Sequence, residues 1–475
     1  MLIFTLVIKQ TNIAIPKKDG KKNDFSFSVV LRRTAERLPH FLMEFSEVFR
    51  SQTHNCHDQV TGYVQGLFKS PKGRANCYFM GNNLDQWNGQ NLHHMLTHSP
   101  WEYSKLFKAI LSRSIKLLRS QKQRIYILID EVGHRKKGKH SACVGQQYIG
   151  SIGKNDNGQV AVTAALSSKD FYCPVEMELF MPKDWETDLE RRYKAGVPDN
   201  KKQESKTVMA LRMIKRLFKP LSKEVECVVF DALYGYKLDF LWQLVRLQIP
   251  FVGDVRGKLA VYLSKPILKI PPQSGKGPKF IKERPTKPSV LIKDYVDSLS
   301  KTDFTLLTVR NGTKGAIQAR YHMRKVWVHH EPSNSFMSLY LLVRKDADGK
   351  IKYSLGSFNK QKVTILRMAK AQAQRAFIER VFEEGKNIVG LGDYQTRSWN
   401  GFHRHAALSS LAILFLMEQK IHLKQTIGKI TAYHIQELVN ATVNTLSSLE
   451  QVIERLARQI PRYQNQIENR LKLVT

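Results

Sequence analysis

The fold is decided by the stretch Arg124-Ile-Tyr-Ile-Leu-Ile-Asp130, an apolar run rich in β-branched residues that ends on a carboxylate. A short run of this composition predicts a buried central strand. A second run of the same kind, Val225-Glu-Cys-Val-Val-Phe-Asp231, also ends on an aspartate. If the two strands are neighbours, Asp130 and Asp231 lie together at one edge of a sheet.

Helix and strand patterns alternate around these two runs, which predicts a mixed α/β fold. Residues 27–120 have a helical pattern, and so do residues 206–218 and 236–247. The sequence Asn155-Asp156-Asn157-Gly158 predicts a hairpin turn between two strands, because Asn-Gly and Asp-Gly favour such turns. After Trp399 the pattern is helical throughout, with interruptions expected near Gly428 and Pro461.

Residues 256–293 differ from the rest in composition. They contain ten Lys or Arg residues, six prolines and a single acidic residue, Glu283. Prolines at this density exclude a core helix, so we expect an extended basic loop or insertion. Strand patterns return over residues 304–353, with a hairpin turn at Asp346-Ala347-Asp348-Gly349.

The net charge of the chain is +35, from 76 Lys and Arg residues against 41 Asp and Glu residues. Solubility alone needs a net charge of only about 2–8, so this excess favours a polyanionic partner such as nucleic acid. The apolar runs at 1–10 and 406–417 are shorter than the ~18 residues that span a bilayer, so we expect no membrane partner. Five scattered cysteines argue against a disulfide framework.

Two neighbouring carboxylates at a strand edge repel each other unless a cation offsets their charge. A hard divalent ion with oxygen ligands, typically Mg²⁺, is the usual cation at such a pair. Alternatively, Asp130 and Asp231 each cap a turn or the following helix. The two aspartates alone do not decide between these interpretations.

Residues 364–389 form the longest helical pattern in the chain, and this helix offers a third acid. At 100° per residue, Arg375, Glu379 and Lys386 project from one face, with Gln372 on the same stripe. The alternative is ordinary salt bridging between residues four apart on an exposed face.

Two other acids on this helix compete for the same role. Glu383 lies about 40° from Glu379 around the helix axis, so it is a real alternative to Glu379. Glu384 points about 140° away from Glu379 and is expected to be solvated.

The spacing Arg375-x3-Glu379-x6-Lys386 resembles the Tyr-Arg-Glu-Lys signature of a large group of bacterial DD-E insertion-sequence transposases, with Gln372 at the Tyr position. Four further blocks, in the same order along the chain, are similar to one branch of these enzymes: YVQGLFKSPKGRANCYFM, LIDEVGHRKKGKHSACVGQQYIGSIGKNDNGQVAV, MPKDWETDLERRYKAGVP and GLGDYQTRSWNGFHRHAAL. The resemblance covers residues 63–416, which is most of the chain.

The resemblance implies a ribonuclease-H-like mixed sheet flanked by helices, with the first Asp on the first strand and the second on the fourth. It also implies a β-rich insertion before the helix that bears the Glu, and helical N- and C-terminal regions. The expected units are a DNA-binding region at 1–120, a catalytic core at 121–255 and 361–418, an insertion at 256–360 and a C-terminal region at 419–475.

The resemblance further implies that Asp130, Asp231 and Glu379 are the catalytic residues and the ligands of two Mg²⁺ ions, for which Mn²⁺ can substitute. Arg375 and Lys386 carry over as contacts to the DNA backbone, and Gln372 stands at a third such contact. In two-metal catalysis, one ion activates water or a DNA 3′-hydroxyl and the other stabilises the leaving oxygen.

Further DNA contacts are expected from the basic loop after the first aspartate and from one aromatic residue. The loop residues are Arg135, Lys136, Lys137 and Lys139. Trp327 is a candidate for stacking on an extruded base. The alternatives are a solvated basic loop and a tryptophan packed within a strand.

The sequence therefore predicts a cut-and-paste DNA transposase that binds double-stranded DNA, both inverted-repeat ends and target, as a homodimer in the synaptic complex. The expected location is the cytoplasm of a prokaryote, associated with the nucleoid. Two alternatives remain: a catalytically inactive DNA-binding protein derived from a transposase, and a ribonuclease-H-like nuclease.

Overall fold

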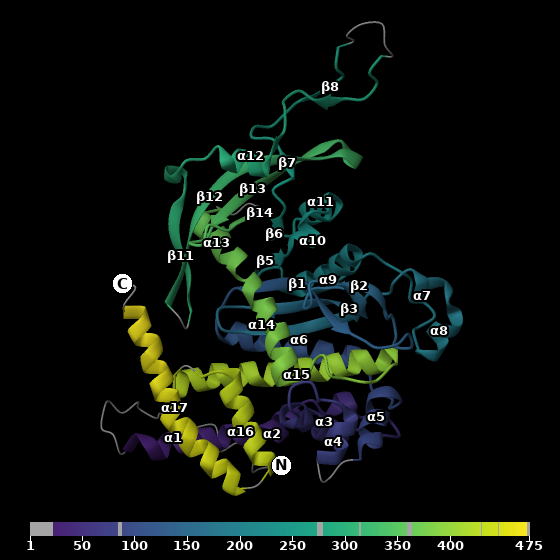
Figure 1. Ribbon diagram of the computed structural model, residues 1–475, viewed down its shortest axis with the longest axis vertical. Coiled ribbons are helices and arrows are strands. Elements are labelled where there is room, and N and C mark those ends of the chain that lie inside the picture. The colour runs from purple at the N-terminus through teal and green to yellow at the C-terminus, as the bar shows by residue number, and fades with distance from the viewer. Residues whose placement is uncertain are drawn as a thin grey trace.

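The computed structural model describes residues 22–83, 88–272, 279–312, 315–358, 363–428, 430–444 and 446–472. The N-terminal run at 1–10, from which we expected no membrane span, lies outside these residues. Ten strands form one mixed sheet flanked by helices, which confirms the predicted α/β fold (Figure 1).

The sheet runs in the order β11-β12-β13-β14-β6-β5-β1-β3-β2, and β4 also pairs with β3. Its strands are β1 (Ile125–Arg135), β2 (Gly145–Ile149), β3 (Lys154–Ser167), β4 (Tyr172–Leu179), β5 (Val225–Phe230), β6 (Phe251–Val255), β11 (Thr305–Gly312), β12 (Gly315–His330), β13 (Ser335–Lys345) and β14 (Ile351–Ser357). Among the neighbouring strand pairs described in this sheet, β1–β5 and β5–β6 are parallel and the others are antiparallel. The order β4-β3-β1-β5-β6 is the mixed sheet of a ribonuclease-H-like core.

Both strands predicted from the apolar runs are present, but β1 is longer than predicted. β5 ends at Phe230, directly before Asp231, as expected. β1 continues to Arg135, because it remains paired with β3 as far as Gly158. Asp130 therefore lies within its strand, and Asp231 follows the fifth strand of the chain, because the short β2 precedes β3.

The hairpin between β2 and β3 turns earlier than predicted. Asn155 and Gly158 lie within β3 and pair with β2. The turn is at residues 150–153, where Gly153 has a φ of +67° and its N–H donates to the carbonyl of Ile149. A glycine adopts this left-handed conformation without strain, so the turn forms there. The turn predicted at Asp346–Gly349 is confirmed.

Helices cover both faces of the sheet, as two adjacent residues of β1 show. Asp130 is within ion-pair distance of Arg375 on α14 (Arg375–Ile388). Glu131 pairs with Lys206 on α9 (Lys206–Leu221). Adjacent residues of a strand point to opposite faces, so α14 and α9 lie on opposite sides of the sheet.

The helix expected over residues 364–389 is divided in two. α13 (Ile365–Ala373) packs against β5, β6 and β11 to β13, whereas α14 packs against β1 and β4. The break is at Gln374, where the N–H of Phe377 bonds to the carbonyl of Gln374. Gln372 and Arg375 therefore lie on different helices.

A single long helix, α15 (Trp399–Thr426), lies along the sheet and packs against β4 and against helices of the N- and C-terminal regions (Figure 1). The N-terminal helices are α1 (Lys22–Ala35), α2 (Arg37–Met43), α3 (His57–Lys69), α4 (Cys77–Asn83), α5 (Gly89–Thr97) and α6 (Tyr103–Ser120). By length and composition α15 could cross a membrane, but 83% of its most apolar window is buried inside the protein. It is the core helix of the molecule.

The C-terminal helices are α16 (Ala432–Asn444) and α17 (Leu446–Lys472). Pro461 lies within α17, so the interruption predicted there is wrong. The remaining helices are α7 (Asp184–Thr187), α8 (Leu189–Lys194), α10 (Ala232–Gly235), α11 (Leu238–Arg246) and α12 (Ile292–Asp297).

The strands of the predicted insertion extend the central sheet, because β14 pairs with β6. Between them, β7 (Ala260–Val261) pairs with β10 (Val290–Leu291), and β8 (Leu268–Lys269) pairs with β9 (Arg284–Pro285). The β8–β9 ribbon projects far from the body of the protein (Figure 1). The insertion boundaries remain a prediction. Strands before residue 256 and strands after it belong to one continuous sheet, so the sheet does not mark a boundary there.

Close packing between β5 and β6 yields a testable prediction. A Cβ atom at Gly253 would lie 1.9 Å from Cε2 of Phe230, a side chain with no exposed surface. We expect Gly253→Ala to cost roughly 1–3 kcal/mol of stability and to lower the melting temperature. Gly150→Ala is the control, because nothing lies within 4 Å of its Cβ position. Equal melting temperatures for the two variants would contradict this packing.

Candidate active site

Asp130 and Asp231 lie side by side because their strands are parallel neighbours. Ile129 on β1 is the register partner of Phe230 on β5, so the next residue of each chain segment is an aspartate. Asp231 also caps α10, because its Oδ1 accepts a hydrogen bond from the Leu233 N–H at 2.9 Å. Asp231 therefore caps a helix, as the alternative interpretation predicted. It also lies beside Asp130, as the neighbouring strands predicted.

A third strand-end carboxylate, Asp254, was missed in the sequence. It lies on β6, where Gly253 is the register partner of Phe230 on β5. Burial raises the pKa of Asp254, although Ser354 and Arg375 oppose that rise. The signal was present in the sequence, because Asp254 comes near the end of the short run Pro250-Phe-Val-Gly-Asp-Val255.

The guanidinium of Arg375 is the common partner of these acids. Its Nη2 lies 3.8 Å from Asp130 Oδ2, its Nε lies 3.8 Å from Asp254 Oδ2, and its Nη1 lies 2.9 Å from Glu379 Oε1. Burial alone would lower the pKa of Arg375, but the surrounding carboxylates raise it. Arg375 is therefore a fixed positive charge among four acids, the fourth being Asp231.

Among the acids of the cluster, Asp130 has the most strongly shifted pKa. Burial raises its pKa to about 7; Arg375 counteracts this effect, and the nearby charge of Asp231 adds to it. An aspartate in this setting loses its proton readily only when a cation comes close. The cluster thus has the electrostatic character of a cation site.

Glu379 is placed at the edge of the cluster, with 62% of its side chain exposed. It shares Arg375 with Asp130, as the common helix face of Arg375 and Glu379 predicted. Glu383 is exposed. Glu384, expected to be solvated, instead accepts a hydrogen bond from the Tyr172 hydroxyl at 2.7 Å.

The donors fit a hard divalent cation in their chemistry, because all are carboxylate oxygens. In their present positions, no three His, Cys, Asp or Glu side chains among the described residues are close enough to hold one ion. The Arg375 guanidinium supplies the positive charge among them instead. The assignment of Asp130, Asp231 and Glu379 as metal ligands therefore remains a prediction.

Gln372 does not lie where a DNA contact was predicted. It is 5% exposed, and its Nε2 donates a 2.6 Å hydrogen bond to Ser354 Oγ. The break at Gln374 places Gln372 on α13, directed toward β14. Its position does not support a direct phosphate contact.

The basic loop after Asp130 divides into inward and outward residues. The Lys136 ammonium donates to the carbonyl of Tyr394 at 2.9 Å and lies 3.4 Å from the centre of its ring. Burial lowers the pKa of Lys136 to about 8. Its predicted DNA contact is therefore not supported, whereas Lys137 and Lys139 are exposed. Arg135 is exposed and pairs with Asp156.

Two other residues that were predicted to contact DNA, Lys386 and Trp327, have half-buried side chains. Lys386 Nζ lies 3.3 Å from the carbonyl oxygen of Gly133, and burial lowers its pKa. Trp327 on β12 exchanges backbone hydrogen bonds with Tyr262, and the Lys325 ammonium lies 5.6 Å from its ring centre. Their DNA contacts remain predictions.

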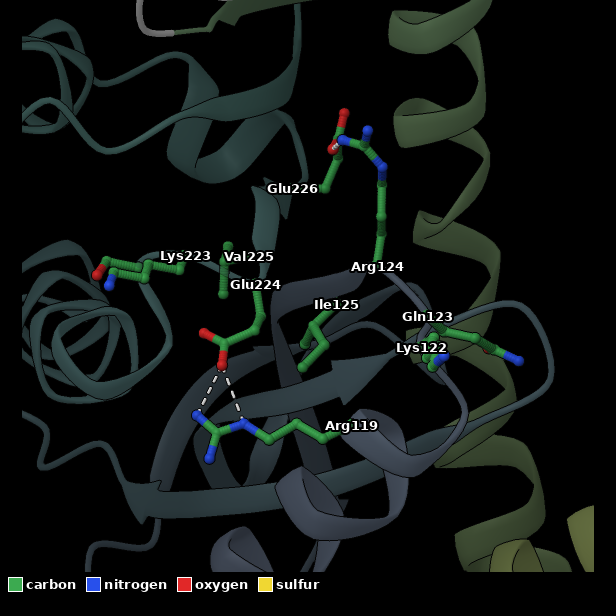
Figure 2. Close-up of a pocket in the computed structure, with 10 residues that line it drawn as sticks. Arg119, Lys122, Gln123, Arg124, Ile125, Lys223, Glu224, Val225 and Glu226 are labelled. Carbon is green, nitrogen blue, oxygen red and sulfur yellow. Dashed lines mark hydrogen bonds and ion pairs between the residues drawn. The ribbon is translucent and has the colours of Figure 1, made fainter.

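A separate cavity of about 600 Å³ lies at the opposite ends of β1 and β5. Figure 2 shows its charged rim, where Arg119 bonds to Glu224 and Arg124 lies beside Glu226. Because β1 and β5 are parallel, this cavity is at the amino ends of the strands and the acids are at the carboxyl side. The cavity is therefore distinct from the carboxylate cluster.

Comparison with known families identifies the chain. A family model described as "DDE superfamily endonuclease" matches residues 44–316, which is more than half of the sequence. The chain belongs to the DDE superfamily of endonucleases. The matched region of this DDE superfamily member contains Asp130, Asp231 and Asp254, and it ends before α14.

Two further proteins are similar to this DDE superfamily member. A protein of Microchaete diplosiphon, described as "Probable transposase for insertion sequence element IS701", is 34% identical over 170 residues. That match covers 36% of this chain and 41% of the relative's length. The structure of a piggyBac transposase synaptic complex with hairpin DNA aligns over 94% of this chain and 85% of its own, at 10% identity and a TM-score of 0.38.

The raised pKa of Asp130 makes the stability of this DDE superfamily member depend on pH. The folded protein retains the proton up to about pH 7, whereas the ordinary value is 3.8. Wild-type stability should therefore fall as pH rises between these values, by about 2–4 kcal/mol. We expect Asp130→Asn to melt at a higher temperature than wild type above pH 7, and the difference to shrink toward pH 4.

The control for this measurement is Glu383→Gln, which removes an exposed acid from the same region. Its melting temperature should follow the wild type at every pH. A constant difference between Asp130→Asn and wild type from pH 4 to 8 would show that Asp130 titrates normally.

Proposed function

We propose that this DDE superfamily member is the cut-and-paste transposase of an insertion sequence and belongs to the Tyr-Arg-Glu-Lys signature group. The observation that carries the proposal is that Asp130, Asp231 and Glu379, from β1, the end of β5 and α14, all lie near the half-buried guanidinium of Arg375. Family membership supports endonuclease chemistry, and the similarity to an insertion-sequence transposase supports transposition.

Asp130, Asp231 and Glu379 would hold two Mg²⁺ ions, with Mn²⁺ as a substitute. When bound, the ions supply the charge that activates water or a DNA 3′-hydroxyl and stabilises the leaving oxygen. Asp130 would hold the ion in its ionised form, because only the ionised carboxylate is a ligand. Glu379 is exposed and so is free to turn from Arg375 toward its neighbouring acids.

Double-stranded DNA is the proposed partner, and the distribution of charge supports it. The β8–β9 ribbon projects from the body (Figure 1). Its described cations are all exposed, against the single acid Glu283: Lys265, Lys269, Lys279, Lys282, Arg284 and Lys287. A two-stranded ribbon fits the major groove of DNA. Near the acids, Lys137 and Lys139 offer further phosphate contacts.

The catalytic assignment is tested with DNA that carries the inverted repeats flanking the gene itself, incubated with purified protein and Mg²⁺. We expect Asp130→Asn, Asp231→Asn and Glu379→Gln each to reduce nicking at the repeat ends at least about 100-fold, because each removes a carboxylate ligand. DNA binding, measured by gel shift, should be retained. Asp231→Asn keeps the cap of α10, since asparagine is as good an N-cap.

Glu383→Gln is the matched control on α14 and should cleave like the wild type. If Glu383→Gln is inactive and Glu379→Gln is active, the catalytic glutamate is Glu383. If the wild type binds the repeats and does not cut them, the protein is an inactive DNA-binding derivative. Cleavage of RNA–DNA hybrids in preference to the repeats would indicate a nuclease.

The DNA contact of the β8–β9 ribbon is tested by the salt dependence of binding. The triple variant Lys265→Gln, Lys269→Gln, Lys282→Gln should bind more weakly at low salt. The slope of log affinity against log salt should also become shallower by up to about 3, because each lost phosphate contact removes ~0.9.

The control for this measurement is a second triple variant of exposed lysines that are already paired with acids. It comprises Lys105→Gln, Lys194→Gln and Lys350→Gln, whose partners are Glu102, Glu190 and Asp348. An equal change of slope in the two triple variants would show that the ribbon makes no specific contribution.

A further inference from the structure

A buried chain of three polar side chains ends on the carboxylate cluster. Gln372 Nε2 donates to Ser354 Oγ at 2.6 Å, and Ser354 Oγ donates to Asp254 Oδ1 at 2.6 Å. Ser354 has no exposed surface and Gln372 has 5%. The chain thus connects α13, β14 and β6 within the core and ends beside the Nε of Arg375.

The direction of each hydrogen bond follows from the donors available. A serine hydroxyl has one proton, which goes to the Asp254 carboxylate. Ser354 Oγ must therefore accept from the amide of Gln372. The geometry is set by the sheet, because Ser354 and Asp254 are direct register partners of β14 and β6.

Arg375 is close both to this fixed acid and to two of the acids proposed to bind the metal. Its Nη groups face Asp130 and Glu379, and its Nε faces Asp254 at 3.8 Å. The buried Nε has no hydrogen-bond partner. A small shift of the guanidinium toward Asp254 would satisfy this donor.

We propose that Asp254 is a positioning residue that retains Arg375 when Asp130 and Glu379 release it to become ligands of a divalent cation. The chain Gln372–Ser354–Asp254 keeps the Asp254 carboxylate in place for this role. The inference rests on the proposed function, because it requires that Asp130 and Glu379 bind a cation.

The physical reason is competition between two cations for the same oxygens. A guanidinium and a divalent ion cannot both lie against Asp130 and Glu379, because like charges repel. With Asp254 as an alternative partner, Arg375 stays buried and paired after it leaves the other two. Without Asp254, its remaining partners are the same oxygens that the cation needs.

The experiment measures Mn²⁺ affinity of the purified full-length protein without DNA, from the electron paramagnetic resonance signal of free Mn²⁺. We expect Asp254→Asn to weaken Mn²⁺ binding about fivefold. Ser354→Ala should weaken it about twofold, because it changes no charge but releases the carboxylate. Ser354→Thr retains the hydroxyl and should restore wild-type affinity.

A double-mutant cycle with Arg375→Gln separates positioning from simple loss of charge. Arg375→Gln alone should tighten Mn²⁺ binding, because it removes the competing guanidinium. In that background, Ser354→Ala should have no effect, and Asp254→Asn should have less effect than in the wild type. An undiminished effect of Asp254→Asn would mean that its charge acts directly on the cation, and would overturn the proposal.

The remaining outcomes distinguish this inference from the proposed function. If wild type binds no Mn²⁺, the metal-dependent function fails. If wild type binds Mn²⁺, and Ser354→Ala and Asp254→Asn bind it equally well, only the role of Asp254 is wrong. Should Asp254→Asn fail to fold by circular dichroism, the Ser354→Ala, Ser354→Thr and Arg375→Gln variants decide the question.

Discussion

Carboxylates on or directly after three adjacent parallel strands lie near the half-buried guanidinium of Arg375, and the centre of the molecule depends on this balance of charge. β1, β5 and β6 bring Asp130, Asp231 and Asp254 to the same edge, where burial raises the pKa of Asp130 and of Asp254. Arg375 offsets that cost from α14. The position of α14 against β1 is therefore an electrostatic requirement as much as a matter of packing.

The central strands could be predicted because their composition favours a strand over a helix or a loop. The short apolar runs before Asp130 and Asp231 are rich in β-branched residues, which predicts buried strands. The turn at residues 150–153 was not predicted, because Asn155–Gly158 carries the stronger local signal and pairing with β2 overrides it. The division of the helix at Gln374 has no Gly or Pro to mark it and follows from packing on two different parts of the sheet.

The candidate site shows the same distinction between local and long-range information. Arg375 and Glu379 were placed together correctly because they lie four residues apart within one helix. Gln372 was misplaced because that helix breaks between it and Arg375. The inward position of Lys136 depends on Tyr394, a residue far away in the sequence, so no local pattern reveals it. Asp254 followed the same strand-end pattern as the other two aspartates and was overlooked.

The continuity of the ten-stranded sheet has a mechanical consequence. β14 joins the outer strands β11 to β13 to β6, and its Ser354 holds the carboxylate of Asp254. A force applied to the outer strands is transmitted through rigid hydrogen-bonded ladders to the residues beside Arg375. The outer strands and the carboxylate cluster thus belong to one continuous hydrogen-bonded sheet, so a displacement of those strands would reach Asp254 through β14.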